Sequence, residues 1–374
     1  MLKNNDNKKI VFISNTSWYL WNFRRNLMLS LKGEGFQIYA IAPKDKYSDN
    51  LALDFNFIEL KNVDRKGTNP FKDIKLFFEI LNIYKELKPS VVFNFTIKLN
   101  IYSSFVCKKL KIKYLNIITG LGSSFLQKSF LRKFTLILYK IAFKKSSKII
   151  FQNEDDHDFF IKRKIISKNK AMIIRGSGID TSFFVSDPNY VQKNSSKIIF
   201  LMISRLLRDK GIFEFMSAAK IVKERFPEVE FRLIGPLDVE NPSSVDMEYM
   251  KNWSDYVIYC GEKEDVREAI KESNVVVLPS YREGTPKNLL EAMSMGKPII
   301  TTDVAGCRQL IHNEENGFLV PVKNIERLAD AMIKFIYLPI DIQKEMGEKG
   351  RKIVLNEYSD TIVINSFLNL LKTI

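Results

Sequence analysis

Histidine and cysteine are scarce in this sequence, with two histidines and three cysteines among 374 residues. The cysteines, Cys107, Cys260 and Cys307, lie far apart and do not follow the spacing of metal ligands. We therefore expect reduced, buried thiols in a cytoplasmic protein. Because the two histidines are also isolated, the sequence predicts no metal site and no metal cofactor.

Long hydrophobic runs and several catalytic motifs are also missing. No run of 18 or more apolar residues occurs, so we predict no membrane-spanning helix. The first residues are polar and lead into a strand pattern at Lys9–Ser14, which argues against a secretory signal. No G-x-G-x-x-G follows that strand, which argues against a dinucleotide-binding dehydrogenase. The absence of G-x-S-x-G leaves a serine hydrolase without support.

Acidic residues are absent from one long stretch of the chain. Residues 101–150 contain 11 Lys and Arg but no Asp or Glu. Residues 1–178 hold 33 basic and 14 acidic residues, a net charge of +19, whereas the remainder holds 25 and 29, a net charge of −4. This asymmetry predicts a polyanionic partner for the first half alone. The candidates are nucleic acid, a diphosphate-bearing acceptor and an anionic membrane surface.

Strand and helix patterns alternate along most of the chain. The length favours two domains, and the alternation predicts an α/β protein with doubly wound parallel sheets. The predicted strands are Lys9–Ser14, Phe36–Ala42, Val91–Phe95, Tyr114–Ile118, Ile149–Gln152, Met172–Ile174, Lys197–Ile203, Glu230–Gly235, Val257–Cys260, Val275–Leu278 and Gly317–Val320. The predicted helices include Trp18–Lys32, Pro70–Leu87 and Ile97–Leu110, with later helices beginning at Ile325, Asp341 and Asp360.

The most informative stretch is Val275–Gly306, which has the pattern of one βαβ unit. Its buried strand ends at Pro279, and a helix follows from about Lys287 to Met295. Thr285 is the predicted helix cap, and Pro286 suits the first turn because no N–H is needed there. A second strand covers Pro298–Thr302. A loop that leaves a strand and enters a helix N-terminus is where open α/β sheets bind ligands, anions above all.

Two carboxylates and two basic residues accompany such loops. Glu283 lies in the loop and Glu291 in the helix, and a carboxylate that accepts two hydroxyl hydrogen bonds suits a sugar or ribose ring. The alternative is two solvated carboxylates on a surface helix. Arg205 and Lys210 follow the strand Lys197–Ile203 and precede a helix. That position predicts a diphosphate site, and the alternative is two surface cations.

This stretch resembles the retaining glycosyltransferases of family 4, which have the two-domain GT-B fold. The matching pattern is a buried strand followed by Pro279-Ser280, Glu283-Gly284, Pro286, Leu290-Glu291-Ala292, Gly296, Pro298 and Gly306. The resemblance extends through most of the chain and implies two Rossmann-like domains with the active site in the cleft between them. It implies an acceptor-binding domain at residues 1–178 and a nucleotide-sugar-binding domain at 197–355, joined by a linker at Ser186–Ser196. The helix at 356–374 is expected to pack back on the first domain.

The resemblance also implies roles for individual residues of a metal-independent hexosyltransferase. Arg205 and Lys210 would neutralise the leaving nucleoside diphosphate in place of a metal ion. Glu283, with the backbone N–H groups of Gly284 and Thr285, would hold hydroxyls of the donor sugar, and Glu291 would hold the ribose. Further donor contacts are expected from Asn15, Thr16, Gly120, Gly122, Glu262, Pro286, Asn288 and Leu289, and acceptor contacts from Arg24 and Thr119.

Departures from the family pattern point to a subgroup. The first strand-to-helix turn, Ser14–Ser17, has no glycine, and Thr119 stands where some members place a donor-binding histidine. Thr119-Gly120-Leu121-Gly122 resembles a subgroup that transfers N-acetylhexosamines, often N-acetylgalactosamine, to undecaprenyl-diphosphate-linked sugars, although a tight turn explains the glycines equally well. The subgroup implies a UDP-sugar donor, a lipid-linked diphosphate sugar acceptor and a peripheral location on the inner face of the cytoplasmic membrane.

Other readings remain open. The donor could be a different hexose or a deoxyhexose, and the basic first half would also suit a nucleic-acid-binding protein, although no recognition motif is present and no nucleic acid is expected. Asp156-His157-Asp158 fits the D-x-D of metal-dependent GT-A transferases, but the run opens a helix, where acidic residues complement the N-terminus. His312 follows a predicted helix at Gly306–Arg308 and is expected to be structural.

The basic stretch contains an amphipathic segment at Phe125–Lys145. Apolar residues recur there at helical spacing, and part of that apolar face is expected to belong to the core. The surplus of Lys and Arg without any acid predicts attraction to anionic lipid. The basic residues concerned are Lys128, Arg132, Lys133, Lys140, Lys144 and Lys145.

Overall fold

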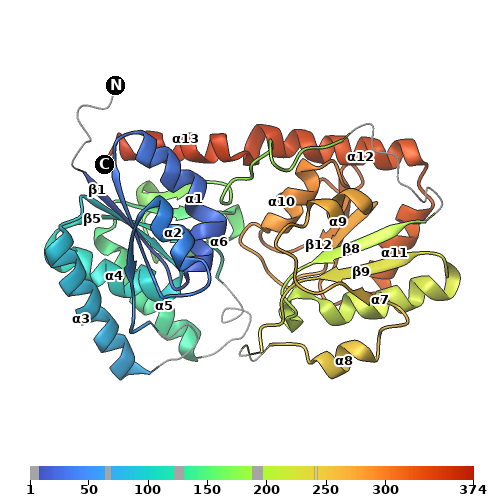
Figure 1. The fold of residues 1–374 in the computed structure, drawn as a ribbon, viewed down its shortest axis with the longest axis horizontal. Coiled ribbons are helices and arrows are strands. Elements are labelled where there is room, and N and C mark those ends of the chain that lie inside the picture. Colours follow the sequence, from blue (N-terminus) through green and yellow to red (C-terminus); the bar gives the residue numbers. More distant parts are fainter. Residues whose placement is uncertain (1–7, 64–68, 122–129, 188–196, 240, 242) are drawn as a thin grey trace. The chain divides into compact units, whose positions relative to one another are not determined.

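The computed structural model describes residues 8–63, 69–121, 130–187, 197–239, 241 and 243–374. The chain forms two compact units: the first comprises 1–178 with 360–374, and the second comprises 179–359. Each unit holds one parallel sheet with helices against it (Figure 1), which confirms the predicted fold class. Most of the predicted linker, Ser186–Ser196, lies outside the described residues.

The first unit is built on a seven-stranded parallel sheet in the order β3-β2-β1-β4-β5-β6-β7. Its strands are β1 (Lys9–Ile13), β2 (Gln37–Ala42), β3 (Asn56–Glu59), β4 (Val91–Phe95), β5 (Lys113–Ile118), β6 (Lys148–Phe151) and β7 (Ala171–Ile173). Its helices are α1 (Ser17–Gly33), α2 (Ser48–Asp54), α3 (Pro70–Leu87), α4 (Ile97–Leu110), α5 (Phe130–Ala142), α6 (Glu154–Lys162) and α13 (Asp360–Leu371).

Helices of the first unit cover both faces of its sheet. On one face, α1 and α13 pack against Phe12 and Phe93, and the ring of Phe367 from α13 lies 5.9 Å from that of Phe93. On the other face, α3, α4 and α5 pack against residues that include Val11 and Phe151. This two-sided cover explains why most residues of the central strands are apolar.

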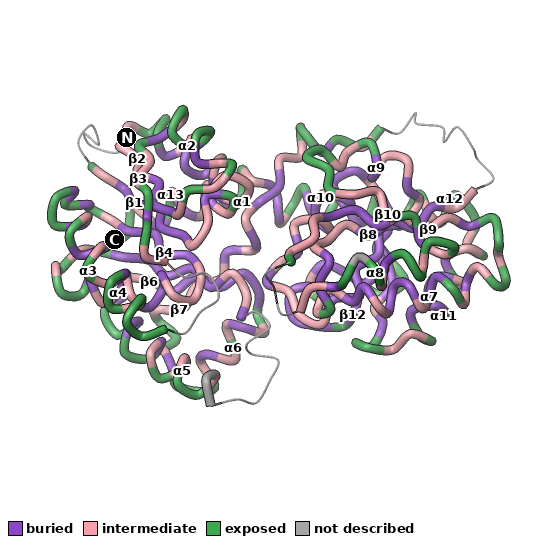
Figure 2. Tube along the Cα trace, turned by 60° about the horizontal axis from the view of Figure 1, so that its bottom comes forward, coloured by how far each residue is buried: buried purple, intermediate pink, exposed green. Residues whose placement is uncertain are grey.

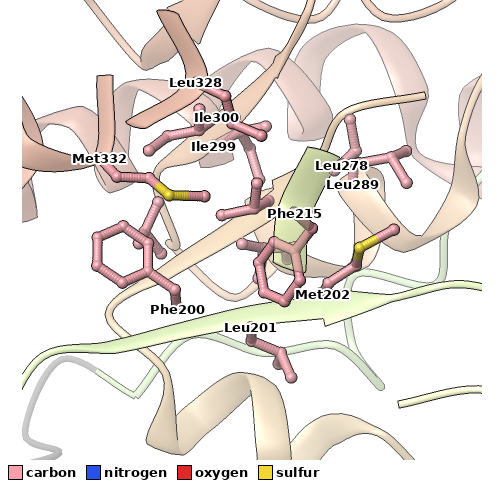
Figure 3. Packing of buried hydrophobic residues seen from close by; sticks show 14 of the residues in the cluster. Phe200, Leu201, Met202, Phe215, Leu278, Leu289, Ile299, Ile300, Leu328 and Met332 are labelled. Atoms are coloured by element: carbon pink, nitrogen blue, oxygen red, sulfur yellow. The ribbon is translucent and has the colours of Figure 1, made fainter. Parts of the chain in front are cut away.

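The second unit has a six-stranded parallel sheet in the order β10-β9-β8-β11-β12-β13. Its strands are β8 (Ile199–Ile203), β9 (Glu230–Ile234), β10 (Ile258–Tyr259), β11 (Val275–Leu278), β12 (Ile299–Thr302) and β13 (Gly317–Val320). Its helices are α7 (Ile212–Arg225), α8 (Met247–Lys251), α9 (Arg267–Glu272), α10 (Lys287–Ser294), α11 (Ile325–Ile336) and α12 (Ile340–Ile353). Phe200, Phe215, Ile300 and Met332 meet in its core (Figure 3).

Some local predictions were wrong or incomplete. The sequence patterns missed α2 and β3, two short elements between β2 and α3. The expected helix at Gly306–Arg308 is a series of turns. Cys260 is partly exposed, whereas Cys107 and Cys307 are buried as expected, and all three are free thiols. Among the described residues, no helix combines the length and apolar character needed to cross a membrane.

Candidate active site

The predicted site residues of the second unit lie where its strands end. The loop after β11 is held against the loop after β12, because the Glu283 N–H donates to the Ala305 carbonyl at 3.1 Å. Gly306 makes this approach possible: its φ is +82°, and a Cβ there would lie 2.5 Å from the Gly284 carbonyl oxygen. A side chain at this position would push the Glu283 loop out of place.

Lys210 and Glu283 form an enclosed ion pair in this loop. The Lys210 Nζ donates to Glu283 Oε1 at 2.5 Å, and the Ser280 hydroxyl donates to the same oxygen at 2.7 Å. The two charged side chains are only 17% and 12% exposed. Lys210 is brought here by Gly211, whose φ is +78° and whose Cβ would lie 2.1 Å from the Pro279 carbonyl oxygen. The pair therefore depends on a close approach between two backbone segments.

A second contact ties the same two segments together. The Tyr281 N–H donates to the Asp209 carbonyl at 2.9 Å, and the Tyr281 hydroxyl donates to Glu214 Oε1 at 2.7 Å. Burial, followed by the hydrogen bond to Glu214, raises the pKa of Tyr281 well above its ordinary value, so the hydroxyl remains protonated. Sequence patterns gave no sign of this contact, because Glu214 lies on α7 and is 67 residues away from Tyr281.

Arg205 also has a carboxylate partner, but in a more open setting. Its Nη1 donates to Asp238 Oδ2 at 3.0 Å, and its side chain is 38% exposed. Arg205 follows β8 and Asp238 follows β9, which are neighbours in the sheet. Both predicted diphosphate ligands are thus charge-paired, with Lys210 the better enclosed of the two.

The start of α10 differs from the prediction. Thr285 does not cap the helix: its hydroxyl donates to the Gly284 carbonyl at 3.0 Å and accepts from the Gln309 amide at 3.0 Å. Pro286 is the cap residue and provides no side-chain hydrogen bond. The explanation is that Gln309, from the turns after β12, holds Thr285 in the loop. A side chain remote in sequence therefore overrides the local capping preference.

Asn288 and Leu289, both predicted to contact the donor, have structural contacts at the start of α10. The Asn288 amide donates to the Ile203 carbonyl at 2.5 Å and accepts from the Leu289 N–H at 3.0 Å, which fixes α10 against the end of β8. The Leu289 side chain is fully buried in the core. These contacts position the start of α10, and the donor contacts of both residues stay predictions.

The alternative of two solvated carboxylates does not hold for Glu283 and Glu291. Their side chains are 12% and 13% exposed. Glu291 lies 3.7 Å from Lys287, one turn earlier on α10. Burial raises the pKa of the Glu291 carboxyl, and Lys287 offsets part of that rise. A buried carboxylate with one basic neighbour can accept hydrogen bonds from a vicinal pair of hydroxyls.

Glu262 lies farther along the same sheet edge, on the loop after β10, where it is exposed. The preceding residue, Gly261, accepts a hydrogen bond from the Gly235 N–H at 3.0 Å, which joins the loops after β9 and β10. The carboxyl edge of this sheet thus collects Arg205, Lys210, Glu262 and Glu283, as the βαβ pattern predicts.

The predicted donor and acceptor residues of the first unit follow the ends of β1 and β5 where the structure describes them. Thr16 caps α1, accepting the Tyr19 N–H at 3.1 Å, and the partly exposed Asn15 precedes it. Thr119 and Gly120 follow β5 and are partly exposed, whereas Gly122 lies outside the described residues.

Arg24 faces the core of the first unit and is not on its surface. It is 1% exposed, donates twice to the Tyr19 hydroxyl at 3.0 and 2.8 Å, and lies 4.8 Å from the ring centre of Phe95. In this structure Arg24 is therefore closed off from solvent, and its contact with an acceptor stays a prediction. The helical position that turns Arg24 towards the sheet also encloses its guanidinium between aromatic rings.

The acidic residues near His157 lie at the N-terminus of α6. Asn153 caps α6 by accepting the Asp156 N–H at 2.8 Å, and Glu154, Asp155 and Asp156 form the first turn. His157 Nδ1 lies 3.0 Å from the carboxylate of Asp158. Within the described ranges, no group of three His, Cys, Asp or Glu side chains is arranged to hold a metal ion.

Comparisons with known proteins agree with this architecture. Residues 9–153 match the family described as glycosyl transferase 4-like, and residues 186–353 match glycosyl transferases group 1. Among solved structures, sucrose-phosphate synthase from Thermosynechococcus elongatus superposes with a TM-score of 0.80 at 18% identity, covering 98% of both chains. Anabaena Alr3699/HepE, solved in complex with UDP, gives 0.81 at 14% identity, covering 98% of this chain and all of the other.

Two curated relatives are similar in sequence. One is the N,N'-diacetylbacillosaminyl-diphospho-undecaprenol alpha-1,3-N-acetylgalactosaminyltransferase of Campylobacter jejuni, 29% identical, with 97% of this chain and 98% of the relative covered. The other is the UDP-Gal:alpha-D-GlcNAc-diphosphoundecaprenol alpha-1,3-galactosyltransferase of Escherichia coli, 26% identical over 70% of each chain. The two family matches and the two parallel-sheet units together show that this chain belongs to the GT-B glycosyltransferases, with a glycosyl transferase 4-like first domain and a group 1 second domain.

Proposed function

We propose that this protein transfers an N-acetylhexosamine, in the first instance N-acetylgalactosamine, from a UDP-sugar to an undecaprenyl-diphosphate-linked sugar. The observation that carries the proposal is the enclosed Lys210–Glu283 pair at the sheet's carboxyl edge. It offers one cation for a diphosphate and one carboxylate for sugar hydroxyls, side by side. The nearly full-length likeness to the Campylobacter jejuni relative supports the choice of donor and acceptor.

In the proposed mechanism the donor diphosphate replaces the carboxylate partners of Lys210 and Arg205. As the bond from the sugar C1 to the diphosphate oxygen breaks, negative charge grows on the leaving UDP, where the two cations stabilise it without a metal ion. Glu283, released from Lys210, accepts hydrogen bonds from the donor sugar. The acceptor hydroxyl attacks the same face of C1 with net retention, and its proton passes to a diphosphate oxygen.

Glu291 is assigned to the ribose of UDP. Its side chain is largely buried on α10, where a pair of neighbouring hydroxyls would satisfy both oxygens. The raised pKa of this carboxyl fits the role, because a desolvated carboxylate gains more from two hydroxyl donors than a solvated one.

The first unit is assigned to the acceptor and to the membrane. Its net charge of +19 over residues 1–178, from 33 basic and 14 acidic residues, suits the acceptor diphosphate and anionic lipid at the inner face of the cytoplasmic membrane. The Escherichia coli relative, named as a galactosyltransferase, supports a hexosyl donor as the alternative. The basic charge would also suit nucleic acid, but the enclosed carboxylates at the site favour a sugar ligand.

A donor panel tests the proposal. The purified protein is mixed with UDP-N-acetylgalactosamine, UDP-N-acetylglucosamine, UDP-galactose, UDP-glucose and a GDP-sugar, each with a synthetic lipid-diphosphate sugar and with EDTA in parallel. We expect transfer from UDP-N-acetylgalactosamine, unaffected by EDTA, with an α-linkage in the product by NMR. Transfer only from another donor would overturn the assigned sugar, and strict dependence on added metal would overturn the mechanism.

A further inference from the structure

Helix α5 carries a row of large apolar side chains that remain about half exposed. Phe134, Ile137 and Ile141 are spaced three and four residues apart, so they share one face of the helix, and they are 48%, 57% and 47% exposed. The opposite side carries the buried Tyr139 and Ala142, which join the core. The apolar pattern of this segment therefore exceeds what core packing requires.

Helix α3 carries a matching row that the sequence analysis did not single out. Phe71, Ile74 and Phe78 have the same three-and-four spacing and are 75%, 54% and 55% exposed. Leu76 and Ile80 of this helix lie in the core. Isolated exposed apolar residues are ordinary on a protein surface, whereas apolar side chains gathered on one face are a feature of interaction sites.

The two helices belong to one layer. Both pack beside α4 on the same face of the sheet (Figure 2): Lys98 and Tyr102 of α4 each bond to Asp73 of α3 at 2.8 Å, and Ile101 of α4 shares a core cluster with Tyr139 of α5. Each helix follows a parallel strand, so all three begin at the carboxyl edge of the sheet. The rows on α3 and α5 therefore flank α4 on one side of the unit.

Basic side chains surround these rows, while the nearby acids are occupied. Asp73 is bonded to Lys98 and Tyr102, and the Glu79 carboxylate accepts the backbone N–H groups of Lys61 and Asn62 at 2.7 and 2.9 Å. The remaining acid of α3, Glu86, lies in its last turn, beyond the apolar row. Exposed lysines on the two helices, and just after α5, are Lys72, Lys75, Lys133, Lys140 and Lys144.

We propose that α3 and α5 together form the surface that docks on an anionic lipid bilayer. The two apolar rows enter the boundary between headgroups and acyl chains, and the flanking lysines contact lipid phosphates. A second copy of this chain fits poorly, because the like charges of the two surfaces would meet. This inference rests on the proposed function in one respect: the acceptor assigned there is lipid-linked, so docking brings the enzyme to its substrate.

Vesicle co-sedimentation tests the surface. The variants are Phe71→Ser/Ile74→Ser/Phe78→Ser on α3, Phe134→Ser/Ile137→Ser/Ile141→Ser on α5, and both sets combined. The matched control, Tyr337→Ser/Ile340→Ser/Ile342→Ser, removes apolar side chains of the second unit that are 67%, 60% and 42% exposed. We expect binding to phosphatidylglycerol-containing vesicles at low salt to fall about tenfold for each triple variant and to vanish for the combination. The control should bind like the wild type, and all variants should keep the wild-type melting temperature.

Insertion of the apolar side chains into the bilayer is measured separately from the attraction of the lysines to anionic lipid. Phe78→Trp, compared with the wild type, should show a blue-shifted emission and quenching by brominated lipid when anionic vesicles are added. Lys72→Gln/Lys75→Gln should weaken binding and reduce its salt dependence, whereas Lys349→Gln/Lys352→Gln on α12 should not. An α3 variant that binds like the wild type, or an introduced indole whose emission ignores brominated lipid, would overturn the role of α3.

A water-soluble acceptor separates this inference from the proposed function. With a short-chain lipid-diphosphate sugar and no vesicles, the triple variants should retain wild-type turnover, whereas with acceptor embedded in vesicles they should lose it. Vesicle binding without any sugar transfer would overturn the proposed function and leave the docking surface standing. A lipid-free dimer that the α3 variant dissociates, seen by sedimentation velocity, would assign the surface to a second copy.

Discussion

The ammonium group of Lys210 lies 2.5 Å from Oε1 of Glu283, so the cation assigned to the donor diphosphate is already neutralised in the free protein. Both side chains are mostly enclosed. An enclosed ion pair gives up its partner only to a group that restores the lost charge and hydrogen bonds. A diphosphate can do so, because its oxygens take over Lys210 while the attached sugar offers hydroxyls to Glu283.

The first prediction follows from the different settings of the two cations. Lys210→Ala should lower turnover by at least about two orders of magnitude, since one preorganised charge is worth ~3 kcal/mol at the transition state. Arg205→Ala should lose less, because its side chain is 38% exposed and solvent screens it. Steady-state kinetics with the preferred donor measure both, and Lys349→Ala on α12 serves as the exposed control. Wild-type turnover in both variants would be incompatible with the mechanism.

Replacing Glu291 and replacing Glu283 should affect different steps: the binding of UDP and the transfer of the sugar, respectively. Glu291→Ala should weaken the binding of UDP itself, because a partner of the ribose is lost. Glu283→Ala should leave UDP binding intact, or tighten it by freeing Lys210, while sugar transfer falls. Isothermal calorimetry with UDP and a transfer assay distinguish the two effects. If UDP binding and sugar transfer were unchanged in both variants, Glu283 and Glu291 would have only a structural role.

The hydroxyl of Tyr281 should act as a positioning group for the ion pair. Tyr281→Phe leaves Glu214 Oε1 buried without its donor, which should cost about 1–3 kcal/mol of unfolding free energy. Because the same loop carries Glu283, kcat should fall while the affinity for UDP changes little. Glu214→Gln keeps an acceptor for the hydroxyl and should restore most of kcat relative to Glu214→Ala. A loss of stability with unchanged kcat would show that the Tyr281 hydroxyl contributes only to the stability of the fold.

Three glycines allow backbone strain to be separated from steric conflict. Gly306→Ala combines a φ of +82° with a clash against Gly284, so it should destabilise the protein and impair transfer. Gly261→Ala has a φ of +73° but free space, and should cost only about 1–2 kcal/mol. Gly33→Ala, at the end of α1, meets neither obstacle and should be neutral or slightly stabilising. Chemical denaturation orders the three variants, and a harmless Gly306→Ala would contradict the packing of the two loops.

The pH dependence of stability should carry a contribution from Glu291. Its folded-state pKa is raised above the ordinary value of 4.5, so the folded state holds the proton more tightly than the unfolded chain. Stability from this group is present at low pH and is lost as the pH rises from that ordinary value through the raised one. Glu291→Gln cannot ionise, so its stability advantage over the wild type should grow as the pH rises above 4.5. If the stability advantage of Glu291→Gln shrank as the pH rose, the pKa of Glu291 would be lowered by folding and not raised.

Local signals account for the parts of the fold that the sequence predicted well. Helix α3 begins at Pro70 as expected, since the Asn69 side chain accepts the Phe71 and Lys72 N–H groups and proline needs no donor. The helix ends where Lys88 adopts a left-handed conformation. Buried parallel strands such as β11 are continuous apolar runs, which the sequence pattern alone can predict.

Contacts between distant segments account for what the sequence did not predict. The α2–β3 connection was missed because these elements are short and only partly buried. Thr285 has a good capping side chain, yet Gln309 holds it elsewhere. The burial of Arg24 and the Tyr281–Glu214 bond depend on how α1 and α7 rest on their sheets. Such contacts form only when the helices pack on the sheets, so the spacing of residues along the sequence cannot predict them.

Because α13 belongs to the first unit, that unit can be completed only after the second unit has been synthesised. This helix follows the whole second unit in the chain, yet its Val363, Phe367 and Leu370 cover part of one face of the first unit beside Phe93. During synthesis, α1 can cover its share of that face at once, whereas the share covered by α13 stays exposed while residues 179–359 emerge. We expect the nascent chain to be most prone to aggregate in that interval, before α13 is made.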